Sequence, residues 1–140
     1  MKNAKLLFIL LFVVIASCST DSEDTITLSD LTLETSTRTA ILSELETTLT
    51  AEKGVFIQYE ESKVLEIDGA MYLRAWSGDF VTTILLGKGK DGKLQSRSVS
   101  CTTSACSHIG SACRPTDENT CTPCSGGDCT KTVTSGISFE

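Results

Sequence analysis

Six of the seven cysteines lie close together near the C-terminus, and their types and spacing could support three kinds of chemistry. They are Cys101, Cys106, Cys113, Cys121, Cys124 and Cys129. The stretch CTPC, from Cys121 to Cys124, has the C-x-x-C spacing of a redox dithiol, in which a helix N-terminus lowers the pKa of the first cysteine. The flanking PTDENT and SGGDCT have the composition of neither the strand nor the helix that such a dithiol needs. A thiol–disulfide oxidoreductase using Cys121 and Cys124 is therefore the alternative and not our first interpretation.

The same cysteines could ligate a metal together with His108, the only histidine. Structural zinc takes four thiolate or imidazole ligands, commonly from two C-x-x-C pairs. This chain has one such pair and otherwise wider spacings, and thiolates outside the cytoplasm tend to be oxidised first. We predict no metal and no cofactor, and a metal-binding cysteine module is a further alternative.

Three structural disulfides account best for the cluster. The number of clustered cysteines is even, and the stretch around them has one aliphatic side chain, Ile109, besides its alanines. Such a stretch cannot bury enough apolar surface to order itself, so cross-links must do so. Sequence cannot choose the pairing. Because a bridge between Cys121 and Cys124 would close a small strained ring, we expect longer-range partners for both.

The stretch GKGKDGKL, residues 87–94, matches the start of a phosphate-binding loop but lacks its essential context. Leu94 stands where the magnesium-binding hydroxyl should be, and a strand is expected to follow where a helix should begin. Without a helix N-terminus there is no set of amides to hold phosphates. We therefore predict a lysine-rich hairpin loop and no nucleotide binding.

The start of the chain resembles the precursor of a bacterial lipoprotein. Two lysines precede an unbroken apolar run from Leu6 to Ala16, which is too short to span a bilayer and has the length of a signal-peptide core. The run ends in IASC, which is similar to a lipobox with its obligatory cysteine at Cys18. The resemblance implies that residues 1–17 are removed and that Cys18 is acylated, so that the membrane is a partner.

The residues after Cys18 bear on where the protein is sent. The acidic run STDSEDT, residues 19–25, loosely resembles the surface-export signal of Bacteroidetes lipoproteins. Ser19 directly after the cysteine also resembles lipoproteins that are sorted to an outer membrane. We expect a cell-envelope protein that is lipid-anchored at the outer membrane and faces either the periplasm or the cell surface.

The net charge excludes two classes of partner. The whole chain has a formal net charge of −6, and loss of the two leader lysines brings it near −8. Nucleic acid and anionic lipid both require a positive face, so we predict neither as an electrostatic partner. No second long apolar run occurs, so lipid on Cys18 is the expected membrane attachment.

One helix and several short strands are expected to position the cysteines. Over residues 36–50, Ile41, Leu42, Leu45 and Leu49 form one apolar stripe, with Ser36 or Thr37 as the cap. Strands are expected at 55–59, 63–67, 70–76, 80–86 and 93–99, the last of them an edge strand because of its polar alternation.

The pair Asp68-Gly69 predicts a two-residue hairpin turn, and Asp91-Gly92 is expected to return the chain into 93–99. Within 70–76, Met71, Leu73 and Ala75 should face one side of the sheet, and Tyr72, Arg74 and Trp76 the other. Trp76 is expected to be a packing residue. The final residues from Val133, with Ile137 and Phe139, regain strand character and could add an edge strand.

The sequence thus predicts an α+β protein: a small antiparallel β-meander with one N-terminal amphipathic helix, followed by a cysteine-rich irregular C-terminal module. Its parts are a lipoprotein signal peptide (1–17), an acidic and polar tether (18–35), the small α+β domain (36–100) and the cysteine-rich module (101–140). We find no nucleophile–base pair and predict no catalytic residue. The expected function is non-enzymatic binding, adhesion or envelope structure, with a protein or a glycan as partner.

Overall fold

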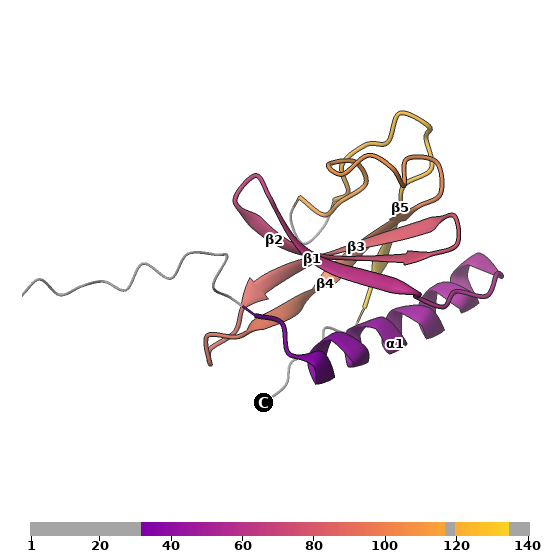
Figure 1. Cartoon of the computed structure of the whole chain (residues 1–140). Helices are drawn as coiled ribbons and strands as arrows, with labels where there is room; N and C mark the ends of the chain where they lie inside the picture. Colours follow the sequence, from indigo (N-terminus) through magenta and orange to yellow (C-terminus); the bar gives the residue numbers. More distant parts are fainter. Residues whose placement is uncertain (1–31, 117–119, 135–140) are drawn as a thin grey trace, which may run out of the picture.

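The computed structural model describes residues 32–116 and 120–134, and in them the chain forms one helix and a five-stranded sheet (Figure 1). Neighbouring strands are antiparallel and follow the chain order β1-β2-β3-β4-β5 across the sheet. The predicted α+β fold with an antiparallel meander is therefore confirmed. The elements are α1 (Thr35–Lys53), β1 (Glu61–Ile67), β2 (Ala70–Ser77), β3 (Phe80–Lys88), β4 (Leu94–Thr103) and β5 (Thr130–Val133).

Helix α1 forms where the apolar stripe predicted it and runs one turn further at its C-terminal end. Its buried residues, Thr37, Ile41, Leu45 and Leu49, recur every four positions and so share one face. The helix ends at Gly54, whose φ of 66° is left-handed and whose N–H donates to the carbonyl of Thr50. The predicted cap was wrong, because Glu34 is the N-cap residue and makes no side-chain capping bond.

The Asp68-Gly69 turn forms as predicted. Ile67 and Ala70 face each other across the β1–β2 ladder, so Asp68 and Gly69 alone make the connection. Both have positive φ, 52° and 76°, as a two-residue turn that matches the strand twist requires.

The stretch 55–59 is not a strand, contrary to prediction. Its backbone N–H groups donate to side chains instead of to a neighbouring strand: Ile57 to Thr50 Oγ1 at 3.0 Å and Tyr59 to Glu46 Oε1 at 2.8 Å. The side chain of Ile57 is 2% exposed, whereas that of Phe56 is 79% exposed. Ile57 and the partly buried Tyr59 thus pack into the core between helix and sheet, whereas Phe56 is exposed to solvent.

Strand β4 is an interior strand, so the prediction of an edge strand at 93–99 was wrong. Its C-terminal part pairs with β5 over Val99–Thr102 and is buried. The polar alternation lies in the N-terminal part of β4, before the Val99–Thr102 ladder with β5 begins. Strand β4 is interior because the chain returns through β5 after the cysteine-rich segment. Of the predicted C-terminal strand, Ile137 and Phe139 lie outside the described residues.

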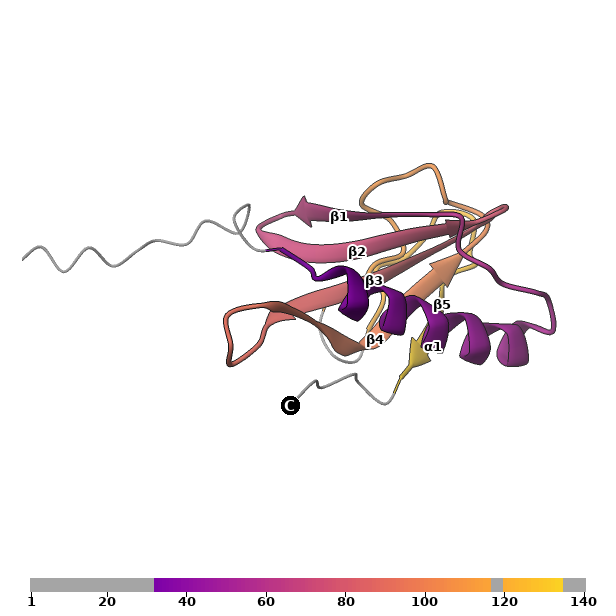
Figure 2. The ribbon, with the colours of Figure 1, turned by 60° about the horizontal axis from the view of Figure 1, so that its bottom comes forward.

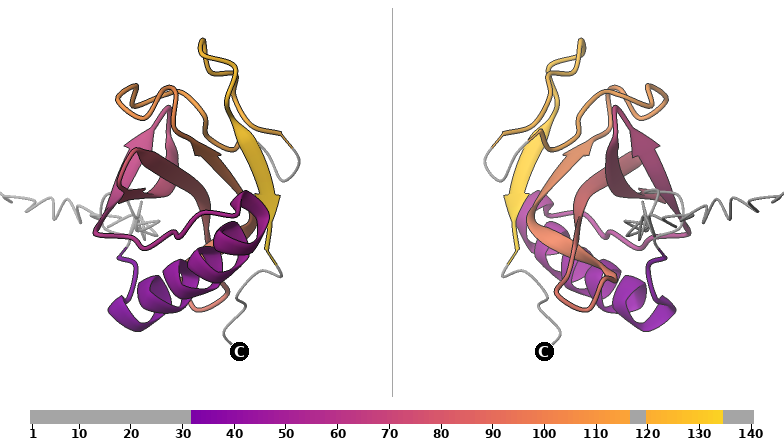
Figure 3. Two further views of the ribbon diagram at one scale, coloured as in Figure 1. Left: turned by 90° about the vertical axis from the view of Figure 1, so that its right-hand side faces the viewer. Right: turned by 90° about the vertical axis from the view of Figure 1, so that its left-hand side faces the viewer.

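Both faces of the sheet are covered, which explains why β2 is buried along nearly its whole length. Met71 and Leu73 pack in the core under α1, as the predicted alternation requires. Tyr72 and Arg74, on the other face, are covered by the cysteine-rich segment. Figures 2 and 3 show α1 along one side of the sheet and the loops of that segment on the opposite side.

Candidate functional site

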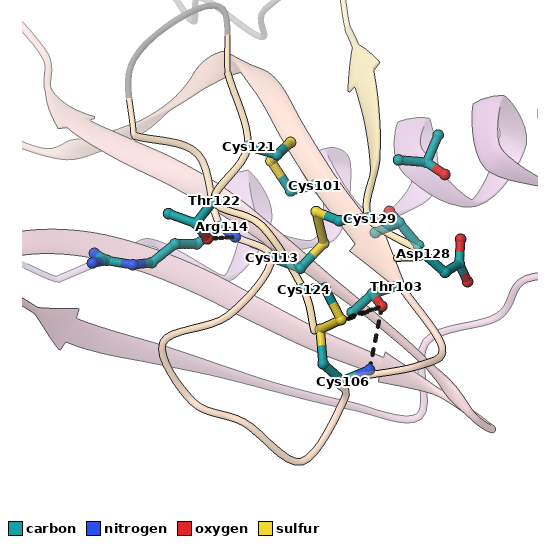
Figure 4. Close-up of a disulfide and its surroundings, with 12 residues drawn as sticks. Cys101, Thr103, Cys106, Cys113, Arg114, Cys121, Thr122, Cys124, Asp128 and Cys129 are labelled. Atoms are coloured by element: carbon teal, nitrogen blue, oxygen red, sulfur yellow. Dashed lines mark hydrogen bonds between the residues drawn. A yellow bond between two sulfur atoms is a disulfide. The ribbon is translucent and has the colours of Figure 1, made fainter. Parts of the chain in front are cut away.

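The cysteine-rich segment, residues 101–129, is held by three disulfides, and we call it the cysteine module (Figure 4). The predicted use of all six cysteines in disulfides is confirmed. The pairs are Cys101–Cys121, Cys106–Cys124 and Cys113–Cys129, with Cα–Cα separations of 5.9, 6.0 and 5.5 Å. Cys121 and Cys124 have distant partners, as expected.

The pairing is interleaved in a regular way. The first three cysteines of the module pair in the same order with the last three, at sequence separations of 20, 18 and 16. The 101–113 half is thereby joined to the 121–129 half at three successive points. Each of the three loops closed by a disulfide therefore overlaps the other two, so the two halves of the module cannot separate from each other unless the disulfides open.

The module is continuous with the sheet at both of its ends. Cys101 lies within β4, where it faces Thr83 of β3 and Lys131 of β5 across the ladders. Residue 100, at which the sequence suggested a division, falls inside β4, and β5 returns the end of the module to the same sheet.

Arg74 of β2 fastens the first half of the module to the sheet. The side chain is buried, at 2% exposure. Its guanidinium donates to the carbonyls of Gly110 at 2.5 Å, Ile109 at 3.0 Å and Ser107 at 3.2 Å. Burial lowers the pKa of Arg74, and three carbonyl dipoles take the place of a carboxylate partner. The 107–110 turn is therefore built around a buried cation.

Tyr72 and Arg114 form a second fastening near the β1–β2 turn. Tyr72 Oη donates to the carbonyl of Pro115 at 3.1 Å, and Arg114 Nη1 donates to the same Oη at 3.1 Å. The Arg114 guanidinium also lies over the Tyr72 ring, 5.4 Å from its centroid. Its Nη2 pairs with Asp68 Oδ2 at 2.5 Å. Asp68 thus has a second role besides forming the turn, because its carboxylate pairs with Arg114 of the module.

Short polar side chains shape the loops between the bridges. Thr103 Oγ1 accepts from the backbone N–H groups of Ala105 and Cys106 and turns the chain out of β4. Thr122 and Arg114 exchange two hydrogen bonds, Arg114 N to Thr122 Oγ1 at 2.9 Å and Thr122 N to Arg114 O at 2.8 Å. These bonds connect the two halves independently of the disulfides.

Asp128 closes the last loop onto the first. Its Oδ2 accepts from Ser104 Oγ at 2.8 Å, and this hydrogen bond lowers the pKa of Asp128. The loops around Gly110 and Gly127 are otherwise exposed.

The geometry of CTPC differs from that of a redox dithiol. Cys121 and Cys124 belong to separate bridges, and the chain after Cys124 makes a turn, with Gly127 N donating to Cys124 O. Within the described ranges the chain has a single helix, α1, which lies on the other face of the sheet. His108 is exposed on the 107–110 turn.

The lysine-rich stretch 87–94 contains the β3–β4 hairpin loop, residues 89–93, between the paired residues Lys88 and Leu94. Gly89 N donates to Lys93 O, and Gly92 N donates to Gly89 O. Strand β4 follows directly, so the loop lacks the helix that a phosphate site needs.

Trp76 lies partly buried beside Arg74 and Lys63, whose charged groups are 5.9 and 5.8 Å from its ring centroid. Lys63 and Arg74 are neighbours across the β1–β2 ladder. The ring thus packs alongside two cations on the face of the sheet that carries the module.

The predicted acylation site lies outside the described part of the chain. Cys18 and the residues around it belong to the undescribed N-terminal range. Helix α1, the single helix in residues 32–116 and 120–134, is not long and apolar enough to cross a membrane.

No known protein family, no curated protein and no solved structure matches this chain. Its function must therefore be inferred from its own residues and their contacts.

Proposed function

We propose that this chain is a lipid-anchored cell-envelope protein whose cysteine module binds a partner without catalysing a reaction. The observation that carries the proposal is the use of all six cysteines of the module as cross-links on a sheet-supported platform. With the thiols consumed in bridges, the module offers shape and polar surface in place of a reactive group.

The construction of the module favours recognition. Its exposed loops are short, and three disulfides together with Arg74 and Tyr72 hold them against the sheet. Binding costs conformational entropy wherever loops become ordered, and loops that are already ordered avoid that cost. A surface of this kind suits a protein or a glycan.

Lipid on Cys18 would hold the module at the membrane. The lipobox-like IASC and the acidic residues after it support anchoring at an outer membrane, with the module facing the cell surface. The net negative charge of the chain argues against nucleic acid and anionic lipid as partners.

Partner capture by the lipidated protein in detergent tests the proposal. The unaltered protein is compared with a variant that carries His108→Glu and Ser125→Glu, at two exposed positions on separate loops of the module. We expect these changes to abolish capture of a cross-linked envelope protein or of glycans on an array, because new charge and bulk block the loops.

The matched control carries the same two charges elsewhere. Ser43→Glu and Gln58→Glu alter exposed positions outside the module, on α1 and on the link to β1. Capture by this control should equal that of the unaltered protein. Equal loss in both variants, or unchanged capture in both, would contradict a role for the module. An insulin-reduction assay that shows turnover dependent on Cys121 would instead support the oxidoreductase alternative.

A further inference from the structure

Two of the three disulfides lie so close together that their sulfurs form one group. The Sγ atoms of Cys101, Cys121 and Cys129 all lie within 4.8 Å of one another. Cys113 is bonded to Cys129, so a fourth sulfur adjoins the same group. In Figure 4 the Cys113–Cys129 bridge is drawn next to the Cys101–Cys121 bridge.

We propose that the reduced form of this protein binds one Zn²⁺ ion through Cys101, Cys113, Cys121 and Cys129. Four thiolates around zinc at about 2.3 Å in a tetrahedron place neighbouring sulfurs about 3.8 Å apart. Three of the sulfurs are already within 4.8 Å of one another. To reach the geometry of a structural zinc site, the sulfurs of each opened bridge must move apart to about 3.8 Å, and Cys113 must turn with Cys129 toward the other two.

The backbone that presents these cysteines does not depend on the two bridges alone. Cys101 is part of β4. Cys129 directly precedes β5, the strand that pairs with β4. Cys121 pairs with Pro115 in an isolated β-bridge. Cys113 directly precedes Arg114, whose backbone exchanges hydrogen bonds with Thr122. These contacts limit how far the four Cα atoms can separate when the bridges open, which lowers the cost of assembling the site.

The remaining bridge packs in the same cysteine cluster, but its sulfurs are not among the three that lie within 4.8 Å of one another. The sulfurs of Cys106 and Cys124 instead contact Thr103 Oγ1, at 3.5 and 3.7 Å. The structure therefore divides the six cysteines into four that can share one metal ion and two that stay outside it. This division is what an experiment can test.

The chemistry balances with a dithiol as the reductant. Each bridge gains two electrons and two protons from one dithiol, which becomes a disulfide, and the protein gains two thiols per bridge. Zinc then replaces the four thiol protons, which pass to water, and the site holds a formal charge of −2. The inference concerns the reduced form, so it goes beyond the proposed function, in which the bridges are closed.

Alkylation of the reduced protein with and without Zn²⁺ tests the proposal. The full chain, in detergent, is reduced with a dithiol, exchanged into a metal-free buffer, loaded with Zn²⁺ and treated with N-ethylmaleimide before peptide mass mapping. We expect Cys106 and Cys124 to be modified in both samples. The other four cysteines of the module should be protected only when zinc is present. Equal modification of all six, or protection that includes Cys106 or Cys124, would overturn the proposal.

A pair of single variants provides the matched control. Cys129→Ser removes a proposed ligand, and Cys106→Ser removes a cysteine outside the group. Competition with a chromogenic zinc chelator should show that Cys129→Ser weakens zinc binding by at least about tenfold, comparable to the loss of a supporting group at other zinc sites. Cys106→Ser should bind as tightly as the unaltered reduced protein, and equal loss in the two variants would refute the assignment. Because partner capture uses the oxidised protein, failure of either proposal leaves the other testable.

Discussion

At the scale of single residues, Arg74 shows how a polar side chain can organise a segment that has no core of its own. A buried charge is costly unless hydrogen bonds compensate for it. Here the compensation comes from the carbonyls of Ser107, Ile109 and Gly110. The cation is thus stabilised only if the turn surrounds it, and the carbonyls of Ser107 and Gly110 take their side-chain donor from the cation.

Replacement of Arg74 should therefore destabilise the protein strongly. Arg74→Met keeps much of the apolar volume but removes the side-chain donor of the carbonyls of Ser107 and Gly110, while Ile109 O keeps only its bond from Ala112 N. We expect the free energy of unfolding to fall by about 2–4 kcal/mol, measured by urea denaturation with the disulfides intact. Lys88→Met, at an exposed end of β3, serves as the control and should change stability little. A loss in Arg74→Met as small as that of the control would show that the turn does not depend on the cation.

Tyr59 should make stability depend on pH in the alkaline range. Burial raises the pKa of Tyr59 from 10.0 to about 12, with its hydrogen bond to Thr82 acting against the shift and Glu46 adding to it. Because the folded pKa lies above the unfolded one, the contribution is complete below pH 10. It is lost as the pH rises from about 10 to about 12.

The comparison with Tyr59→Phe isolates this effect from other alkaline titrations. The variant loses the hydrogen bond from Tyr59 Oη to Thr82 Oγ1, which should cost about 1 kcal/mol at neutral pH. The difference in unfolding free energy between the two proteins should then narrow above pH 10. A difference that stays constant up to pH 12 would mean that Tyr59 titrates alike in both states.

At the scale of elements, the C-terminal end of α1 is fastened to the last strand of the sheet. Lys53 Nζ donates to Thr130 Oγ1 at 2.6 Å, and Thr132 Oγ1 donates to Glu52 Oε2 at 2.8 Å. The helix thereby contacts β5, the strand farthest from it in sequence. How α1 ends therefore affects how β5 is placed.

Gly54→Ala should weaken this end of the helix. Gly54 has a φ of 66°, and an added Cβ would meet no atom within 4 Å. The cost is therefore conformational alone, and we expect a loss of about 1 kcal/mol by thermal or urea unfolding. Gly110→Ala is the matched control, because it also has open space but no left-handed φ. Equal effects of the two substitutions would contradict the conformational explanation.

At the scale of the whole molecule, the protein consists of three layers: the helix, the sheet and the cysteine module. The apolar core lies between α1 and the sheet, and a second cluster made mainly of cysteines lies on the other face. Disulfides stabilise chiefly by restricting the unfolded chain. Cross-links thus order the cysteine module, whereas burial of apolar side chains holds α1 against the sheet.

Mass spectrometry checks the oxidation state directly. The oxidised full chain should weigh six hydrogens less than its fully reduced form, since it contains three bridges. Without reduction, none of the six module cysteines should react with an alkylating reagent, and after reduction in denaturant all six should. Alkylation of Cys121 or Cys124 in the unreduced protein would contradict the closed module.

Removal of one bridge should lower stability without loss of the fold. Cys106→Ala combined with Cys124→Ala leaves the other two bridges and the sheet contacts in place. We expect a loss of about 2–4 kcal/mol in the free energy of unfolding, while circular dichroism keeps its sheet and helix signal. Unchanged stability would mean that the other two bridges alone restrict the unfolded chain.

Local patterns predicted most of the elements, and the failures have a common cause. The four-residue repeat of α1 and the Asp68-Gly69 turn depend on neighbouring residues, so they could be identified from the sequence. The stretch 55–59 and strand β4 were misjudged because their environment comes from distant residues. Glu46 and Thr50 satisfy the backbone N–H groups of the first, and β5 covers the second.

The use of the cysteines divides in the same way between local and distant information. Their even number, their clustering and the shortage of apolar residues around them were enough to predict three disulfides, because those properties can be counted along the chain. The pairing and the closeness of the Cys101–Cys121 and Cys113–Cys129 bridges could not be predicted, since they depend on the return of the chain through β5 and on the attachment of the module to Arg74 and Tyr72. Contacts between residues far apart in sequence leave no local pattern, and only the folded chain brings them together.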